Sequence, residues 1–123
     1  MSVLIDTHIL IWALSSPEKL RSGIRDLLNN NEVLVSSASF WEIQIKRQLD
    51  KLAIDFDLGH LVRDGIVSSL PITYVHSLAV YDLPPIHKDP FDRMLIAQSK
   101  SEGIPLVTAD KNIQQYDLVF ISA

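Results

Sequence analysis

Five short apolar runs alternate with longer helical patterns, and this alternation constrains the fold more than any other feature of the sequence. Each run is rich in β-branched or other apolar residues and is bounded by polar or turn residues, as buried strands are. The runs are VLID (3–6), VLVS (33–36), ITYV (72–75), PLVT (105–108) and LVFIS (118–122). They are too apolar to alternate between a buried and a solvated face, which favours a parallel sheet covered by helices on both sides.

Segments with helical periodicity fill the intervals between these runs. They span residues 8–14, 17–30, 39–52, 57–70, 76–83 and 90–103. Strands that alternate with helices build right-handed βαβ units. We therefore expect one domain over residues 1–123, of the α/β class, folded as a three-layer α/β/α sandwich around a mainly parallel sheet of four to five strands. The order of the strands does not follow from these patterns.

The composition narrows the kinds of site and of partner. The 123 residues include no cysteine, which excludes disulfides and thiolate metal ligands. No apolar run approaches the roughly 18 residues that span a bilayer, and the first residues, MSVLID, lack the features of a signal peptide. We therefore expect a cytoplasmic protein with no membrane partner. The net charge of −4 has the wrong sign for binding nucleic acid by counterion release, unless something outside the sequence neutralises some of the carboxylates.

Acidic residues follow the ends of several expected strands. In an open α/β sheet, ligands bind beyond the carboxyl ends of the strands. Asp6 ends the first strand, and Asp110 follows the run PLVT by two residues. Glu42 lies about one turn into the helix after the second strand, and Asp92 lies in the first turn of the helix after the Pro-rich loop 83–90. Four carboxylates from four segments are therefore expected to point into one crevice.

Each of these acids also has an ordinary structural interpretation. Asp110 suits the N-cap of a short helix, and Glu42 has a lysine four residues later, a pair that is usually solvated. Asp92 lies three residues after Asp89, where a capping-box acid belongs. Asp6 closes a buried strand, although it too could begin a turn or cap the next helix. Because four unrelated caps would not be expected to project to the same edge of a sheet, their joint position favours one acidic site.

A cluster of carboxylates needs a counter-charge, because the groups repel one another and would otherwise take up protons. Mg²⁺ or Mn²⁺ removes this repulsion, prefers oxygen ligands and leaves positions for water or phosphate. The histidines lack zinc spacing and are expected to be surface or loop residues: His8, His60, His76 and His87. We therefore expect an oxygen-only Mg²⁺ or Mn²⁺ site formed by Asp6, Glu42, Asp92 and Asp110.

Basic residues lie close to these acids along the chain. A metal-loaded acidic pocket attracts phosphate even when the protein is anionic overall, and nearby cations could then follow a polynucleotide backbone. The residues in question are Lys46, Arg47, Lys51, Lys88, Arg93 and Lys111. The alternative is that they belong to solvated helix faces.

Four segments together resemble PIN-domain ribonucleases, and among them the VapC-like toxins of bacterial and archaeal toxin–antitoxin pairs. They are LIDTHILIW (4–12), SFWEIQIK (39–46), HKDPFDRMLIAQS (87–99) and PLVTADKNIQQY (105–116). The resemblance implies a PIN-like fold and endonucleolytic cleavage of RNA that depends on Mg²⁺ or Mn²⁺. It assigns Asp6, Glu42, Asp92 and Asp110 as the catalytic and metal-binding residues. By the same resemblance Asp89 is a structural acid and Thr108 is a hydroxyl near the site, whereas Arg93 matches the motif without an evident role.

The resemblance also implies partners. Toxins of this kind usually form homodimers, sometimes within a larger toxin–antitoxin assembly, and a small antitoxin protein inserts a segment that bears Arg or similar groups into the acidic groove. The apolar segments around Trp12 and Trp41 could supply a binding groove for it. The alternative is that both tryptophans belong to the core.

Other functions are compatible with parts of the sequence. A phosphatase of the haloacid dehalogenase type also begins with a strand-end Asp, but it normally has a second Asp two residues later, where this chain has His8. A receiver domain would need an acidic pair near the N-terminus and an Asp at the end of a middle strand, which the chain lacks. The main alternative is a PIN-like module that binds RNA or protein without cutting.

Overall fold

The computed structural model describes all residues, 1–123, and contains a sheet of five strands that are all parallel. The strands are β1 (Ser2–Ile5), β2 (Glu32–Ser36), β3 (Ser68–Leu70), β4 (Leu106–Thr108) and β5 (Phe120–Ser122). Their order in the sheet is β3-β2-β1-β4-β5. Strand β1 therefore lies in the middle, and the order of connection reverses between β1 and β4.

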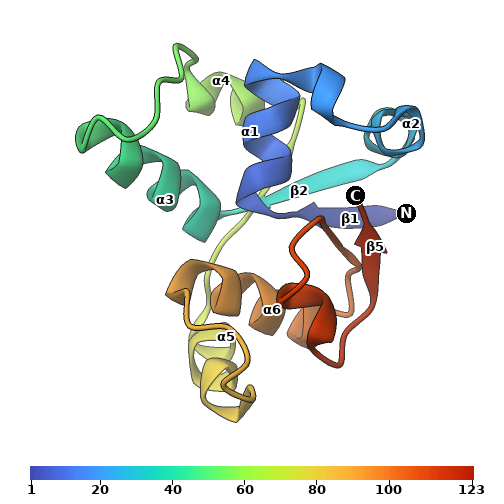
Figure 1. Ribbon diagram of the computed structural model, residues 1–123, viewed down its shortest axis with the longest axis vertical. Helices are drawn as coiled ribbons and strands as arrows, with labels where there is room; N and C mark the ends of the chain where they lie inside the picture. Colours follow the sequence, from blue (N-terminus) through green and yellow to red (C-terminus); the bar gives the residue numbers. More distant parts are fainter.

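Helices cover both faces of the sheet, which confirms the three-layer α/β/α sandwich (Figure 1). The α-helices are α1 (Thr7–Ser15), α2 (Ser22–Asn30), α3 (Ser37–Gln48), α4 (Leu58–Arg63), α5 (Tyr74–Ala79) and α6 (Pro90–Glu102). Short 3₁₀ turns are η1 (Pro17–Lys19), η2 (Val80–Asp82) and η3 (Ile113–Gln115). In Figure 1, α1, α2 and α4 lie on one side of the sheet, and α5 and α6 lie on the other. None of these helices has both the length and the apolar character needed to cross a membrane.

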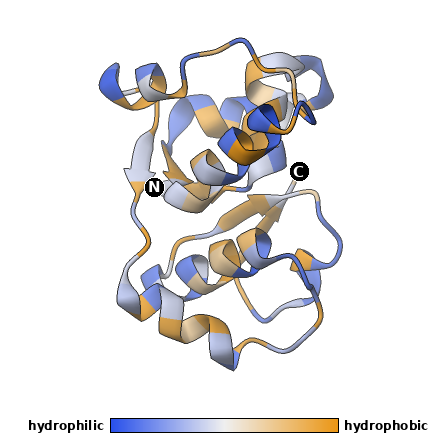
Figure 2. Cartoon of the chain, turned by 90° about the vertical axis from the view of Figure 1, so that its left-hand side faces the viewer, coloured by the Kyte–Doolittle hydropathy of each residue, from blue (hydrophilic) through white to orange (hydrophobic).

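The core consists of two apolar clusters, one on each face of the sheet. Val3 and Ile5 of β1 belong to the cluster beneath α1 and α2, whereas Leu4 belongs to the cluster beneath α6. Successive side chains of a strand point to opposite faces, so a strand buried on both faces must be apolar throughout. This is why the strand segments show no polar alternation. In Figure 2 the strands in the interior accordingly carry the apolar colour, whereas a strand at the left margin is pale.

The prediction of a strand at residues 72–75 was wrong. The third strand is Ser68–Leu70, which pairs with β2 in the register Leu34↔Ser68. Residues 74–79 instead form α5, because Thr73 caps this helix: its hydroxyl accepts a hydrogen bond from the backbone N–H of His76, and the His76 ring accepts one from the N–H of Thr73. The helix expected over 57–70 is correspondingly shorter and ends at Arg63.

Other boundaries differ by smaller amounts. The segment 17–30 is not one helix but the turn η1 followed by α2, with Leu20 and Arg21 in extended conformation between them. Helix α6 agrees closely with the expected 90–103: it begins at Pro90 and ends at Gly103, which has the left-handed φ of 66° that glycine accommodates easily.

The strand order determines which ends lie together. Ile5 of β1 pairs with Val107 of β4, and the backbone N–H of Asp6 donates to the carbonyl of Val107 at 3.1 Å. The residues that follow β1 and β4 are thus neighbours at the point where the strand order reverses, which is where open α/β sheets bind ligands.

Candidate metal centre

Asp6 lies at the carboxyl end of β1 and is only 3% exposed. It is also the N-cap of α1, since its Oδ1 accepts a hydrogen bond from the backbone N–H of Ile9 at 2.8 Å. Burial raises the pKa of its carboxyl above the ordinary value, and the negative charge of Asp110 raises it further, while a hydrogen bond from the Thr108 hydroxyl opposes the shift. Asp6 therefore serves as a cap and as a buried acid at the same time.

Thr108 and Asp110 stand on the neighbouring strand end. The Thr108 hydroxyl oxygen accepts a hydrogen bond from the backbone N–H of Asp110 at 3.0 Å, so this one hydroxyl connects the turn after β4 to Asp6. The two carboxylate oxygens of Asp110 have different partners. Its Oδ1 accepts from the backbone N–H of Asn112 at 2.8 Å, as a cap does, and its Oδ2 faces His87.

Glu42 projects from α3, which starts directly after β2 with Ser36 as its N-cap. Its Oε2 lies 2.8 Å from the Lys46 ammonium, but the pair is not the solvated one that the spacing suggested, because Glu42 is only 5% exposed. Its other oxygen, Oε1, is buried and has no hydrogen-bond partner. A buried carboxylate oxygen without a partner costs free energy unless something else satisfies it.

Asp89 and Asp92 have different roles at the start of α6. Asp89 is the N-cap, and its Oδ1 accepts from the backbone N–H groups of Phe91 and Asp92 at 2.8 and 3.0 Å. Asp92 is partly buried, and this burial, together with the charges of Asp89, Glu42 and Asp6, raises the pKa of its carboxyl to about 7, against the opposing effect of His87. The acid that caps and the acid that faces the cluster are thus distinct.

The four predicted acids lie at the same edge of the sheet, but the group whose ligand-type atoms lie within 4.8 Å of one another contains Asp92 and Asp110 with His87, and not Asp6 or Glu42. Asp92 lies within electrostatic reach of Glu42 and Asp6, and Asp6 within reach of Asp110. Helix α3 packs against both α1 and α6, and a buried hydrogen bond of 2.9 Å from the Thr7 hydroxyl to that of Ser39 joins the starts of α1 and α3. A pocket of about 210 Å³ opens beside the cluster, lined by Asp6, His8, Trp12, Ala109 and Asp110.

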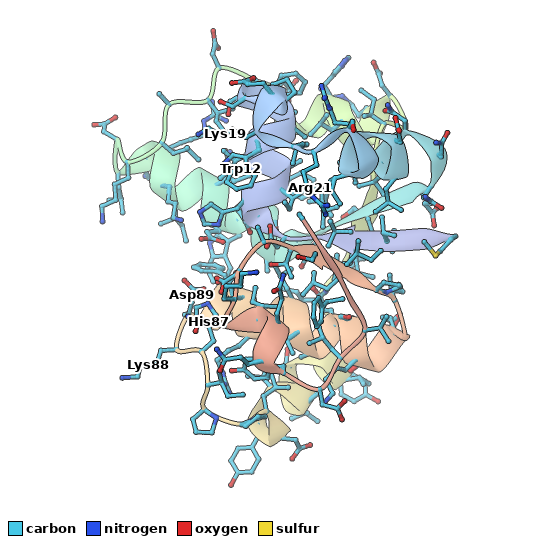
Figure 3. The ribbon with its side chains drawn as sticks, turned by 45° about the vertical axis from the view of Figure 1, so that its right-hand side comes forward. Trp12, Lys19, Arg21, His87, Lys88 and Asp89 are labelled. Carbon is cyan, nitrogen blue, oxygen red and sulfur yellow. The ribbon has the colours of Figure 1, made fainter.

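His87 belongs to the same cluster, although the sequence placed it among residues without a role. Its Nε2 lies 3.0 Å from Asp92 Oδ2 and 3.3 Å from Asp110 Oδ2. These three ligand-type atoms lie within 4.8 Å of one another. Figure 3 shows His87 and Asp89 close together beside α6, with Lys88 extending away from the body of the protein. The sequence signal for this role is the position of His87 two residues before Asp89, the cap of α6.

Of the other three histidines, two lie at the surface as expected and one does not. His8 and His60 are exposed, as expected. His76 is buried, which contradicts the expectation: it lies in the capping box of α5 with its Nε2 3.4 Å from Glu102 of α6. This histidine therefore joins two helices on the face of the sheet away from α1.

Arg93 is partly buried, and its guanidinium is hydrogen-bonded within the protein. Its guanidinium donates to the backbone carbonyls of Val80, Leu83, Pro84 and His87 at 3.0 to 3.3 Å, and to the Tyr116 hydroxyl at 3.3 Å. The Tyr116 hydroxyl in turn accepts from the backbone N–H of His87 at 2.7 Å. Arg93 thus fixes the loop that carries His87, which removes it from the residues expected to follow a polynucleotide backbone. Lys88 and Lys111 are exposed.

The fold and this site together define a class: a parallel α/β protein with a partly buried acidic cluster where its strand order reverses. The PIN-domain family model matches residues 3–119. The chain belongs to the PIN-domain family. A comparison with curated proteins gives no significant match.

Several solved structures have a similar fold. A chain of the crystal structure of VapBC2 from Rickettsia felis, bound to a DNA fragment from its promoter, is 15% identical, with a TM-score of 0.72 over 100% of this chain and 99% of that chain. DNA-bound VapBC from Salmonella typhimurium gives 15% identity and a TM-score of 0.73, with 99% and 98% of the chains covered. FitAcB from Neisseria gonorrhoeae gives 14% and 0.62, with 99% and 97% covered. At these identities the similarity concerns the fold.

Proposed function

We propose that the protein is a divalent-metal-dependent endoribonuclease and the toxin of a toxin–antitoxin pair. The observation that carries this proposal is the position of Asp6, Glu42, Asp92 and Asp110, from four separate elements, at one edge of the sheet, where Asp6 and Glu42 are buried. Membership of the PIN-domain family and the fold shared with VapBC chains support it.

The donor set suits a hard divalent cation. Glu42 Oε1 is buried without a partner, and the burial and mutual repulsion that raise the pKa values of Asp6 and Asp92 would be relieved by a positive charge. Carboxylate oxygens are the ligands that Mg²⁺ and Mn²⁺ prefer. We therefore assign Asp6, Glu42, Asp92 and Asp110 as the residues that hold Mg²⁺ or Mn²⁺.

The proposed reaction is hydrolysis of an RNA phosphodiester bond. A bound divalent cation supplies positive charge that stabilises the developing charge on the phosphate and lowers the pKa of an attacking water. Asp6, Asp92 and Asp110 would hold this cation. Glu42, whose Oε1 has no partner in the protein, would hold it together with them. Thr108 holds Asp6 and the turn of Asp110 in register.

The proposal includes an antitoxin partner. Two surfaces could bind such a protein: the area around the two tryptophans and an apolar pocket. Trp41 is 62% exposed and packs edge-to-face on Phe91, so the interpretation of Trp41 as a core residue was wrong. Trp12 is half-buried, with the Lys19 ammonium 5.9 Å from its ring (Figure 3). A second, apolar pocket of about 320 Å³ lies between α1 and α2, with Arg25 and Asn29 at its edge. Large apolar surface of this kind marks protein-binding sites.

Self-association through α5 is the proposed basis of a homodimer. Tyr74, Leu78 and Tyr81 expose apolar side chains along α5 and η2, and Tyr81 is 91% exposed. We expect Leu78→Glu to shift the purified protein from dimer to monomer in sedimentation velocity, with at least about tenfold weaker association, because a charge would have to be buried. Gln48→Glu, on an exposed position of α3, is the matched control. A dimer unaffected by Leu78→Glu would exclude this face.

The decisive experiment is cleavage of structured RNA with and without metal. We expect cleavage in Mg²⁺ or Mn²⁺, none in EDTA, and recovery on adding back the ion. Asp6→Asn keeps an acceptor for the Ile9 N–H but should lower cleavage by about a hundredfold or more, because it removes a ligand charge. Thermal stabilisation by Mn²⁺ with no cleavage by the wild type would favour the alternative, a non-catalytic binding module. Cleavage at an unchanged rate in EDTA would refute the proposal.

A further inference from the structure

We propose that His87 is a positioning residue that holds the Asp92 and Asp110 carboxylates through a single ring N–H, and that it is not a metal ligand. This inference rests on the proposed function, and it assigns a role to a residue that is not one of the four acids. The alternative is direct coordination, which the geometry at first suggests: His87 Nε2 and one oxygen from each of the two carboxylates lie within 4.8 Å of one another.

The hydrogen bond at the other ring nitrogen decides between the two roles. The backbone N–H of Asp89 lies 3.2 Å from His87 Nδ1 and donates to it. Nδ1 must therefore present its lone pair, so the ring hydrogen is on Nε2. A metal ligand needs the opposite arrangement, in which Nε2 is free of hydrogen and Nδ1–H donates to a carboxylate or carbonyl. His87 thus has the tautomer of a donor.

The Nε2–H points at two acceptors. Asp92 Oδ2 lies at 3.0 Å and Asp110 Oδ2 at 3.3 Å, so one N–H is shared between carboxylates that come from α6 and from the turn after β4. Each carboxylate also has an independent tie: Asp92 sits in the first turn of a capped helix, and Asp110 Oδ1 accepts the backbone N–H of Asn112. The ring therefore fixes the spacing of the two Oδ2 atoms.

The ring is placed by its loop and not by the carboxylates. The backbone N–H of His87 donates to the Tyr116 hydroxyl at 2.7 Å, and its carbonyl accepts from Arg93 at 3.3 Å. Asp89, which orients Nδ1 through its N–H, is itself fixed as the cap of α6. The hydrogen bonds that position the His87 loop and Nδ1 thus do not depend on a bound ion. This is expected of a residue that holds metal ligands in place without contacting the metal.

Ring tautomers are measured by NMR. In ¹⁵N-labelled protein, long-range ¹H–¹⁵N correlations distinguish an Nε2–H ring from an Nδ1–H ring. We expect His87 to show the Nε2–H form in EDTA and to keep it at saturating Mg²⁺, which is diamagnetic. An Nδ1–H ring in either state, or loss of the Nε2 hydrogen on adding Mg²⁺, would overturn the inference. This measurement uses the wild-type protein and does not depend on a variant that folds.

Metal affinity provides the second readout. We expect His87→Ala to bind Mn²⁺ about 10- to 100-fold more weakly in titration calorimetry, the usual effect of losing an outer-shell partner. His87→Gln, whose amide N–H₂ reaches the same place, should restore affinity to within a few fold of wild type. His60→Ala, which changes an exposed histidine on α4, is the matched control. Wild-type affinity in His87→Ala, or no recovery in His87→Gln, would contradict the positioning role.

Asp6→Asn separates this inference from the proposed function. If Asp6→Asn binds Mn²⁺ as tightly as wild type, the metal site itself is misassigned and the proposed function fails. If Asp6→Asn loses Mn²⁺ binding while His87→Ala keeps it, the function stands and the role of His87 is refuted.

Discussion

Asp92→Asn should abolish RNA cleavage while making the metal-free protein more stable at pH 8. The loss of activity, about a hundredfold or more, follows from removing a ligand charge from the proposed metal centre. The gain in stability follows from the environment of Asp92, where burial and the charges of Asp89, Glu42 and Asp6 disfavour the ionised carboxylate. A neutral amide avoids that repulsion, and we expect a gain on the order of 1–2 kcal/mol after allowance for solvent screening.

The pH dependence of stability provides a further check on the same residue. In the unfolded chain Asp92 ionises near 3.8, and in the folded protein its pKa is about 7. Between these values the folded protein keeps a proton that the unfolded chain has released, so the free energy of unfolding falls as the pH rises through this window and stays lower above it. The fall should be smaller in Asp92→Asn, but not absent, because the pKa of Asp6 is raised as well.

These effects are measured by urea denaturation in EDTA from pH 4 to pH 8, alongside RNA cleavage in Mn²⁺. Asp117→Asn, an exposed acid in the last loop, is the matched control and should change neither quantity. Asp92→Asn that cuts RNA at the wild-type rate would show that the cluster is not the reactive site. An unchanged or lower stability at pH 8 would show that Asp92 is not under electrostatic strain.

Arg93→Ala should destabilise the protein by about 2–3 kcal/mol, because it removes the donors to several backbone carbonyls of the loop 80–87 at once. Part of the loss is offset, since water reaches some of these carbonyls. Arg93→Lys should recover little of it, because a single ammonium cannot reproduce the planar fork of the guanidinium. The measurement is urea denaturation, with the unfolding free energy taken by linear extrapolation.

Arg47→Ala is the control for this prediction. Arg47 donates to Gln44 on an exposed part of α3, so its removal should cost less than about 0.5 kcal/mol. If Arg93→Ala keeps full stability and instead weakens RNA binding, then Arg93 contacts the substrate. The interpretation that Arg93 fixes the loop of His87 would then be wrong. Loss of stability with cleavage reduced through the displaced His87 loop is the expected pattern.

Local sequence patterns accounted for the α/β class, for most of the strands and helices, and for the four acids. A run of apolar residues buried on both faces has to be a strand in a covered parallel sheet, and Asp6 ends one such run while Asp110 follows another by two residues. The segment 72–75 shows the limit of this approach. Its β-branched residues suit a strand, but the side chain of Thr73 caps a helix there, and β2 pairs with Ser68–Leu70 instead.

The sequence by itself determined the α/β class and the acids that lie at the ends of the first and fourth strands, because these features follow from patterns of consecutive residues. Only the tertiary structure decided that β1 lies beside β4, that Glu42 is buried, and that His87 and Arg93 support the cluster. These features depend on bonds between residues far apart in the chain, such as His87 with Asp110 and Tyr116 with His87. Spacing along the sequence does not reveal such bonds, since they form only when the packed sheet and helices bring the two loops together.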